Sequence, residues 1–399
     1  MTDVAKQLQE LRDSGLYRRL RLVEGPQGPE VTLAGSPVLL LCSNNYLGLA
    51  DRPRVRDAAA EAALRWGAGA GASRLISGNM EPHRRLESAL AEFNGYESSL
   101  LFGSGYLANT GTIAALSGRD RVVFSDELNH ASIVDGCRLA RAETFVYRHA
   151  DLEHLAWGLE QASGRGALVV SDGLFSMDGD VAPVAGLLEL ARRHGCRLMI
   201  DEAHATGAIG PGGRGSVAAA GLSGEVDVVV GTLGKALGSY GAYVCADAAT
   251  VDLLVNAARP FIFSTAPPPP SLGAAEAALE ILRAEPGLTA ALQANAAALR
   301  EGLTAAGLDV GTSRTQILPV MIGDSGPTMA LCERALEGGV FAQGIRPPTV
   351  PGGTSRLRFT VMATHRPEEL ARAADTVGAA ALELGLASPS PSPTAAQLS

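Results

Sequence analysis

The chemistry that this sequence offers starts with a lysine between glycines. Lys235 stands in VDVVVGTLGKALGSYGAYV, at the end of a short β-branched run. The chain has 33 lysine and arginine residues, and all of them except Lys6 and Lys235 are arginine. A desolvated lysine can lose its proton and attack a carbonyl carbon, whereas a guanidinium cannot. Lys235 is therefore a candidate nucleophile, with a solvated surface lysine as the alternative.

Other polar residues follow short apolar runs of the kind that form strands. In open α/β sheets, ligands bind beyond the carboxyl ends of the strands. After SSLLF, the sequence GSGY opens a helical segment, and Gly105 and Tyr106 there offer backbone amides that suit a phosphate. The remaining strand ends add a carboxylate, two imidazoles and hydroxyls, from His130, Ser176, Asp201, His204 and Thr232.

One cofactor, pyridoxal 5′-phosphate (PLP), needs all of these groups. Its aldehyde needs a lysine, its pyridine nitrogen needs a carboxylate, and its phosphate needs a helix start and hydroxyls. Each residue alone also has a structural explanation, since Asp201 could cap a helix and His130 or His204 could be a core histidine. Their occurrence together, all at strand ends, predicts a PLP site.

The elements that must position these residues alternate along the chain. Helical segments such as PHRRLESALAEFNG are interspersed with short apolar runs, namely SSLLFGSG, DRVVFSDE, AETFVYRH, GALVVSDGLFS, CRLMIDEAHA, VDVVVGTLG and GAYVCAD. This pattern predicts a large α/β domain over residues 47–280 with a mostly parallel, seven-stranded sheet. PFIFSTAPPPP interrupts the pattern, because prolines cannot continue a helix or a central strand.

The rest of the chain is predicted to form three further segments. Residues 1–46 are an N-terminal segment, with an amphipathic helix that ends in YRRLR near residue 25 and an extended part after it. Residues 281–387 are a smaller α+β C-terminal domain. Residues 388–399, SPSPSPTAAQLS, have the low-complexity composition of a disordered tail.

Composition narrows the classes of function. The net charge of −9 and a lack of basic clusters with interleaved aromatics disfavour nucleic acid and anionic membranes as partners. No apolar stretch approaches 18 residues, and the N-terminus lacks the apolar core of a secretion signal. The 5 cysteines are scattered, which favours reduced cysteines in a cytoplasmic protein and disfavours a zinc site.

Three motifs suggest other functions but lack the context that those functions need. DEAH at 201–204 is typical of nucleic-acid-dependent NTPases, yet no phosphate-binding GxxxxGK[ST] loop accompanies it. GAGAGASRLISG at 67–78 follows a helical segment, whereas a dinucleotide-binding loop follows a strand. GLFSMDG has its serine in the wrong frame for a hydrolase nucleophile elbow.

Over residues 15–385, the chain resembles the α-oxoamine synthases, PLP-dependent transferases of fold type I that condense an amino acid with an acyl thioester. The motifs that carry the resemblance are SNNYLGL, GASRLISG, FGSGYLAN, SDELNHASI, GLFSMDGD, DEAHATGAIG, GTLGKALGSYGAY, FSTAPPP and IRPPTVPGGTSRLRFT. It implies an acyltransferase and a homodimer with shared active sites.

The resemblance also implies a role for each site residue. Lys235 binds the PLP aldehyde, Asp201 pairs with the pyridine nitrogen, and His130 stacks on the ring and lies next to the substrate. His204 and Ser176 contact the phenolic oxygen. The phosphate lies at Gly105, Tyr106 and Thr232, helped by Ser264 or Thr265 of a second subunit. The amino-acid carboxylate is assigned to Arg358, with Asn44 nearby, and the acyl substrate to Arg18 and Thr349.

Two motifs favour one activity within this family. GPQGPEV near the N-terminus and IRPPTVP near the C-terminus are similar to the member that condenses L-alanine with a pimeloyl thioester in biotin synthesis. The acyl carrier, coenzyme A or acyl-carrier protein, stays open. The alternatives are glycine acetyltransferase, 5-aminolevulinate synthase and serine palmitoyltransferase, and outside enzymes a catalytically silent scaffold.

Overall fold

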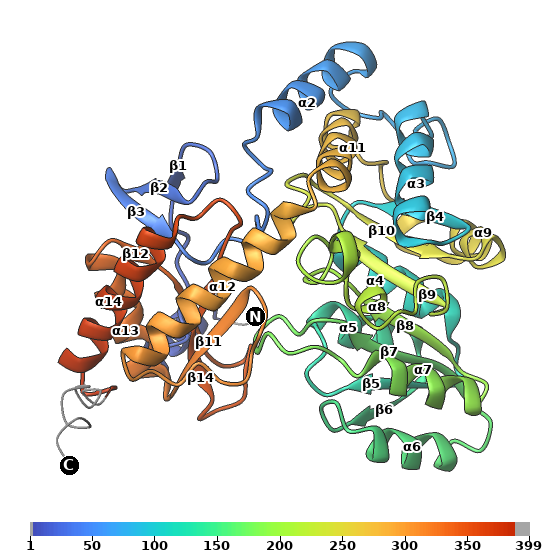
Figure 1. Ribbon diagram of the computed structural model, residues 1–399. Helices are drawn as coiled ribbons and strands as arrows, with labels where there is room; N and C mark the ends of the chain where they lie inside the picture. The colour runs from blue at the N-terminus through green and yellow to red at the C-terminus, as the bar shows by residue number, and fades with distance from the viewer. Residues whose placement is uncertain (1–2, 388–399) are drawn as a thin grey trace, which may run out of the picture. The chain divides into compact units, whose positions relative to one another are not determined.

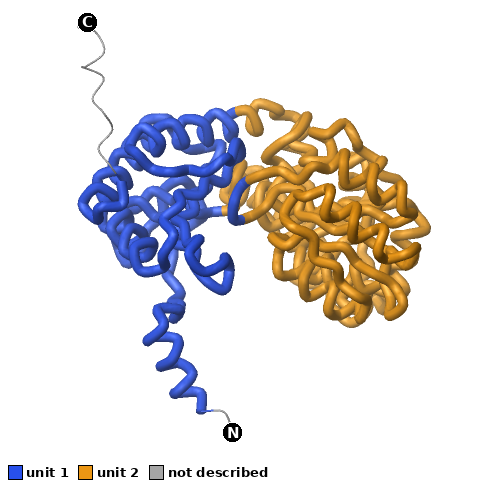
Figure 2. The backbone as a smooth tube through the Cα atoms, turned by 90° about the horizontal axis from the view of Figure 1, so that it is seen from below, with its two compact units in different colours: residues 1–43, 177–179, 291–399 blue, residues 44–176, 180–290 orange. Residues whose placement is uncertain are grey.

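The computed structural model describes residues 3–387 of the chain, which form two compact units. Unit 1 comprises the described residues up to Ser43, residues 177–179, and those from Ala291 onward (Figure 2). Unit 2 comprises residues 44–176 and 180–290. The predicted disordered tail, residues 388–399, lies outside the described residues.

Unit 2 is built on a seven-stranded sheet in the order β4-β10-β9-β8-β7-β5-β6 (Figure 1). Its strands are β4 (Ser98–Phe102), β5 (Val122–Asp126), β6 (Glu143–Tyr147), β7 (Gly166–Asp172), β8 (Arg197–Asp201), β9 (Val228–Thr232) and β10 (Ala242–Ala246). Only β10 runs antiparallel to its two neighbours. The predicted α/β fold with a mostly parallel sheet is therefore confirmed, and each apolar run supplies one strand.

The strands of unit 2 are apolar because the interior of the sheet is covered on both faces. Every residue of β5, β10 and the last five of β7 is buried. The core cluster includes Val123, Val170 and Met199 from the strands and Ile113 from a helix. Each such side chain contributes about 1.5–3 kcal/mol when fully buried, so continuous apolar runs are favoured here over alternating ones.

The helices of unit 2 begin at recognisable capping residues. Ser104, Asp151 and Asp247 accept hydrogen bonds from the first turns of α4, α6 and α9 through their side chains. The helices are α2 (Pro53–Trp66), α3 (Glu81–Asn94), α4 (Gly105–Leu116), α5 (Ala131–Ala140), α6 (Leu152–Gln161), α7 (Val184–Arg193), α8 (Ser216–Ala219), α9 (Ala248–Ala257), α10 (Arg259–Ile262) and α11 (Pro269–Ala284), with the short 3-10 turn η1 (Pro211–Gly213). The proline run ends in the first turn of α11. The backbone N–H that proline lacks would have no partner within the helix at this position.

Unit 1 starts with a helix shorter than predicted. Helix α1 (Val4–Asp13) has no buried residue, and Gly15 has a left-handed φ of 68° just after its end. The expectation of a helix to about residue 25 is therefore wrong, because the glycine ends the helix and the basic residues YRRLR follow it as irregular chain.

Two small sheets complete unit 1. One has the order β1-β2-β3-β12 and the other β11-β14-β13. The elements are β1 (Val23–Glu24), β2 (Glu30–Leu33), β3 (Ser36–Leu40), β11 (Ile317–Gly323), β12 (Val340–Phe341), β13 (Gln343–Ile345) and β14 (Ser355–Thr360), with α13 (Ser325–Glu337), α14 (Pro367–Glu383) and α12 (Gly287–Ala305), whose first residues belong to unit 2. No helix within residues 3–387 has both the length and the apolar character to cross a membrane.

This division differs from the predicted segments 1–46, 47–280 and 281–387. Strand β3 pairs in parallel with β12, with Leu39 opposite Val340. The N-terminal segment therefore belongs to the same unit as the C-terminal part of the chain, and unit 2 runs on to residue 290. A strand pairing between segments about 300 residues apart leaves no signal in local sequence patterns.

Candidate active site

A cavity of about 210 Å³ lies within unit 2 where its parallel strands end. Parallel neighbours carry their carboxyl ends to one edge, so residues that follow β5, β7, β8 and β9 come together there. The cavity is lined by Gly105, Tyr106, Asn109, His130, Ser132, Asp172, Leu174, Asp201, Ala203, His204, Thr232 and Lys235. Of the residues assigned from sequence to the PLP site within one chain, all but Ser176 are in this set.

Lys235 lies in a tight turn after β9. The turn is closed by the Leu233 N–H donating to Gly241 O (2.9 Å) and the Gly238 N–H donating to Lys235 O (2.9 Å). Gly238 has a left-handed φ of 59°, and a Cβ there would come within 2.4 Å of the Ala50 nitrogen. A glycine is thus required to fold the turn that holds the lysine against the cavity.

Asp201 is the last residue of β8 and its side chain is buried. Its carboxylate accepts hydrogen bonds from Asn109 Nδ2 on α4 (2.6 Å) and from the Ala203 N–H (2.8 Å). Asn109 Nδ2 also lies 2.8 Å from Ser132 Oγ. These donors fix the carboxylate at the cavity wall. An acceptor for a protonated ring nitrogen would need to be fixed in this way.

A second buried carboxylate, Asp172, was missed in the sequence assignment. Its Cα is the register partner of Asp201 on the neighbouring strand β7, and its Oδ2 accepts from the His130 N–H (3.2 Å). Burial, and then the charge of Asp201, raise the pKa of Asp172 well above its usual range. The signal was present in the sequence, since VVSD ends a strand with an aspartate as LMID does.

The two histidines occupy different positions at the cavity. His130 is the N-terminal cap of α5, its Nδ1 accepts from the Ser132 N–H (3.2 Å), and the residue is exposed. His204 is buried, and its Nδ1 lies 2.6 Å from Tyr46 Oη, which donates to Asn44 Oδ1 (3.1 Å). Tyr46, which was also missed from sequence, thereby connects the predicted substrate residue Asn44 to the cavity.

The remaining cofactor assignments lie close to the same edge. Gly105 and Tyr106 are the first residues of α4, so their backbone N–H groups belong to the unsatisfied first turn. Thr232 Oγ1 accepts from the Gly234 N–H (3.2 Å) and donates to Gly241 O (3.1 Å). Ser176 is buried in the turn after β7 and is not in the set that lines the cavity.

The assigned substrate residues of unit 1 lie in two places. Arg18 and Thr349 line a cavity of about 820 Å³ together with three further arginines, Arg19, Arg21 and Arg346. Arg346 is buried, and its Nη2 donates to Tyr17 O (2.9 Å). Arg358 is buried in β14, with Pro319 of β11 and Gln343 of β13 as its register partners.

The DEAH sequence has a structural explanation for its second residue. Glu202 is fully buried and accepts from the Ser216 N–H (2.8 Å), Ser216 Oγ (2.9 Å) and the Val217 N–H (2.7 Å). Burial raises the pKa of Glu202 to about 7 although these donors lower it. Glu202 therefore holds the start of α8, while Asp201 beside it lines the cavity.

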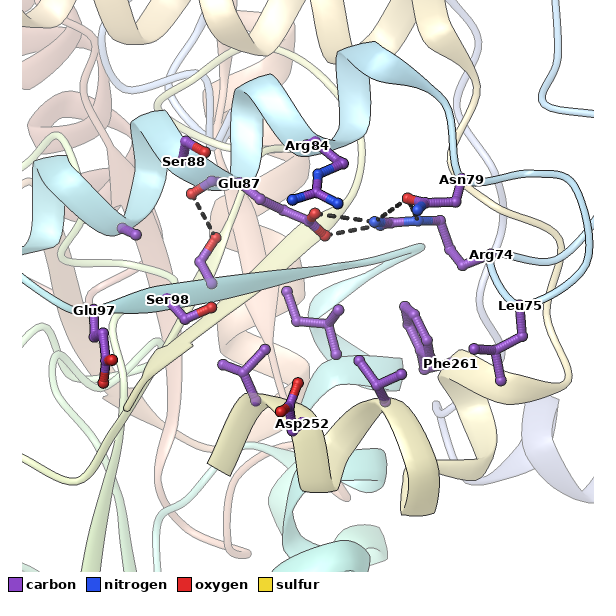
Figure 3. A pocket seen from close by; sticks show the side chains of 15 residues that line it. Arg74, Leu75, Asn79, Arg84, Glu87, Ser88, Glu97, Ser98, Asp252 and Phe261 are labelled. Carbon is purple, nitrogen blue, oxygen red and sulfur yellow. Dashed lines mark hydrogen bonds and ion pairs between the residues drawn. The ribbon is translucent and has the colours of Figure 1, made fainter. Parts of the chain in front are cut away.

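Another pocket in unit 2 is structural. Figure 3 shows Arg74 from the GASRLISG motif in a two-pronged ion pair with Glu87 on α3, with Asn79 Oδ1 accepting from the same guanidinium. Glu87 Oε1 also accepts from the Leu101 N–H (3.0 Å). All these groups are paired with one another, and the pocket contains none of the residues assigned to the PLP site. Its network fixes the loop before α3 to strand β4.

Comparison with known proteins identifies the class to which this fold and cavity belong. The sequence profile described as aminotransferase class I and II matches residues 36–377. The chain belongs to this family, and the predicted α-oxoamine synthase resemblance is confirmed by the relatives below.

The chain is similar to 8-amino-7-oxononanoate synthase from Geobacter sulfurreducens, with 52% identity over 386 residues, 96% of this chain and 99% of the relative. A solved serine palmitoyltransferase variant from S. paucimobilis with a bound PLP–myriocin aldimine has a TM-score of 0.91 and 34% identity, over 96% of this chain and 97% of that chain. A solved 8-amino-7-oxononanoate synthase from Francisella tularensis has a TM-score of 0.75 and 25% identity, over 87% and 98% respectively.

Proposed function

We propose that the chain condenses L-alanine with a pimeloyl thioester, giving 8-amino-7-oxononanoate, CO2 and the free thiol carrier, with PLP as its cofactor. This is a step of biotin biosynthesis. The observation that carries the proposal is the convergence of Lys235, Asp201 and the start of α4 on one cavity in unit 2. The 52% identity to a synthase of this name supports the choice of substrates.

The cavity fits PLP by the chemistry of its groups. The Gly105 and Tyr106 amides and the Thr232 hydroxyl would hold the phosphate, Asp201 the pyridine nitrogen, and His204 and Ser176 the phenolic oxygen. Asn109 Oδ1 is buried without a hydrogen-bond partner at the same wall, as expected where a polar ligand completes the site. When bound, PLP takes up the electron pair released at the amino-acid Cα.

Lys235 would act twice in this reaction. Its amine would hold the cofactor through the aldehyde group until alanine binds. The freed amine would then remove the Cα proton and later return a proton to the product. The turn closed at Gly238 keeps this amine at the cavity throughout.

Binding of the two substrates would use the other assigned residues. The guanidinium of Arg358 would take the alanine carboxylate as a two-pronged pair. Asn44 and His130 are the other residues assigned to this substrate. Arg18 and Thr349 would contact the acyl substrate. The carbon–carbon bond would form between the alanine Cα and the thioester carbonyl, the thiol carrier would leave, and the resulting β-keto acid would lose CO2.

A homodimer with shared sites and a cytoplasmic location also belong to this proposal. The loops around Ser73 and Thr265 pair with each other, and Ile76 (81% exposed) and Phe263 (70% exposed) present large apolar side chains beside that pairing. A second copy is the occupant that would cover them, and it would bring Ser264 or Thr265 to the phosphate. Light scattering should give twice the chain mass, and Phe263→Asp should halve it.

Serine palmitoyltransferase is the alternative with a specific observation behind it, the TM-score of 0.91. The test is a thiol-release assay that crosses L-alanine, glycine and L-serine with acyl thioesters of several chain lengths on both carriers. We expect the highest kcat/KM for L-alanine with the pimeloyl thioester. A preference for L-serine with a long acyl chain, or a purified protein without a visible PLP absorption band, would contradict the proposal.

A further inference from the structure

A histidine outside the cavity connects two of the turns that form it. His149 lies just after β6, and its ring contacts the residues that end β5 and those of the turn that follows β7. Its Nδ1 is 3.0 Å from Asp126 Oδ1 and its Nε2 is 2.8 Å from Asp180 Oδ2. The ring also stands edge-on to Phe175, with ring centroids 4.4 Å apart.

The two hydrogen bonds define the charge of this imidazole. Both partners are carboxylates, which accept hydrogen bonds when ionised, and a neutral imidazole has only one N–H to donate. Both bonds therefore require the imidazolium form. Partial burial acts against that charge, but the hydrogen bonds to Asp126 and Asp180 raise the pKa of His149 to about 10.

The other charged groups nearby do not compete for the ring. Glu127 Oε1 accepts from the backbone N–H of His149 (2.9 Å). Arg148 and Asp151 pair with each other, with 2.7 Å between Nη2 and Oδ2. The ring thus has the carboxylates of Asp126 and Asp180 as its two charged partners among these groups.

Asp126 connects His149 to the turn that carries His130. The Asp126 side chain is 1% exposed and also accepts from the Leu128 N–H (2.9 Å) and the Ala150 N–H (2.8 Å). Leu128 belongs to the turn that leads from β5 to His130 at the start of α5. Any movement of Asp126 would therefore shift the backbone just before His130.

Asp180 connects His149 to the turn that carries Ser176. The Phe175 N–H donates to Asp180 O (3.0 Å), and Leu174 bridges to Val181. These bonds close the turn and hold Asp180 beside Phe175, the residue before Ser176. The contact of the His149 ring with Phe175 adds a third point of attachment to the same turn.

We propose that His149 is a positioning residue for the proposed reaction, whose imidazolium joins the turn carrying His130 to the turn carrying Ser176. The inference rests on the proposed function, because the two turns matter through the PLP contacts assigned to them. His149 itself is not in the set that lines the cavity, so its effect is indirect. Without the cation, the two carboxylates repel and the turns are no longer held in register.

The first test is PLP affinity, measured by absorbance titration of the full-length chain with PLP. His149→Gln keeps a donor of similar reach but cannot carry charge or bridge both carboxylates, so we expect PLP to bind about tenfold more weakly. The matched control is His154→Gln, because His154 accepts from the Arg148 N–H and its ring packs against Phe145 and Trp157. That variant should bind PLP as the parent does. His149→Arg, which restores a cation with several donors, should recover part of the affinity.

The second test follows protonation directly. Because the folded pKa of about 10 lies above the usual 6.5, the charge stabilises the fold fully below pH 6.5 and less as pH rises towards 10. The melting-temperature gap between the parent and His149→Gln should therefore be largest near pH 6 and close as pH rises through about 10. Nitrogen-15 NMR of the parent at pH 8 should show both ring nitrogens of one histidine protonated.

The outcomes separate this inference from the proposed function. If the parent binds no PLP, the proposed function fails whatever His149 does. If the parent binds PLP and His149→Gln binds it equally well, the inference alone is overturned. If His149→Gln does not fold, the nitrogen-15 NMR spectrum of the parent is the test. Absence of a doubly protonated histidine at pH 8 would then overturn the inference.

Discussion

The two cavities that hold most of the assigned residues are built in opposite ways. The cavity of unit 2 measures about 210 Å³ and is bounded by strand ends and short side chains such as Asp201 and Thr232. The cavity of unit 1 measures about 820 Å³ and is lined by Arg18, Arg19, Arg21 and Arg346 in a chain of net charge −9. The cavity of unit 2 is lined by short side chains at strand ends, while the cavity of unit 1 is lined by long, positively charged side chains.

The difference follows from what each cavity is expected to do. Proton transfer and ring stabilisation depend on atoms placed to within fractions of an ångström, which rigid strand ends provide. Attraction of an anionic substrate depends on charge more than on fixed geometry, and arginine provides it even from exposed positions. Substitutions in unit 2 should therefore lower kcat, and substitutions in unit 1 should mainly raise a KM.

The largest effect is expected from Lys235→Ala. Loss of the proton transfer alone costs about 10²- to 10⁴-fold in turnover, while PLP should still bind at the remaining contacts. Lys6→Ala on the exposed helix α1 is the matched control, since Lys6 is the other lysine of the chain. After borohydride treatment of the parent protein, peptide mapping should find the cofactor on Lys235. Turnover within tenfold of the parent, or an adduct on Lys6, would contradict the assignment.

The next largest effect is expected from Asp201→Asn. This change should lower kcat about 10²-fold, because an amide cannot hold the ring nitrogen protonated. Glu202→Gln is the neighbouring control: it should lower the melting temperature, since three donors at the start of α8 lose a carboxylate partner, and leave kcat nearly unchanged. Equal kcat for Asp201→Asn and the parent would mean that Asp201 only supports Asn109.

Arg358→Lys tests whether a buried residue of unit 1 contacts the amino acid. Loss of a charge-assisted hydrogen bond costs about 1.5–3 kcal/mol, so the alanine KM should rise about 10- to 150-fold while the acyl-thioester KM changes little. Arg356→Lys, two residues away on β14 and paired with Asp178, should instead lower the melting temperature. Equal changes in both KM values, with a loss of stability, would end the carboxylate assignment.

The smallest effect is expected from Arg18→Gln. Arg18 is exposed, and exposed ion pairs contribute up to about 1 kcal/mol, so the acyl-thioester KM should rise about fivefold at most and the alanine KM should not. Arg372→Gln, exposed on α14, is the control. Raising the salt concentration should reduce the difference between Arg18→Gln and the parent; no salt dependence would argue against an anionic ligand at this cavity.

Much of unit 2 could be predicted from the sequence because its signals are local. Apolar runs such as LVVSD and LMID predicted the strands. Lys235 and Asp201 could be expected at one cavity because parallel strands carry their ends to one edge. The roles assigned to Arg18, Thr349 and Arg358 rest on resemblance and stay predictions, since no local pattern relates a strand arginine to a carboxylate.

Tertiary structure alone decided the partners of these residues. Asn109 reaches Asp201 and Tyr46 reaches His204 through packing between segments 92 and 158 residues apart. Asp126, His149 and Asp180 meet for the same reason, and the N-terminal strands join unit 1 through the pairing of β3 with β12. A hydrogen bond between distant segments depends on where whole elements pack, whereas hydrophobic periodicity and turn residues specify only the elements themselves.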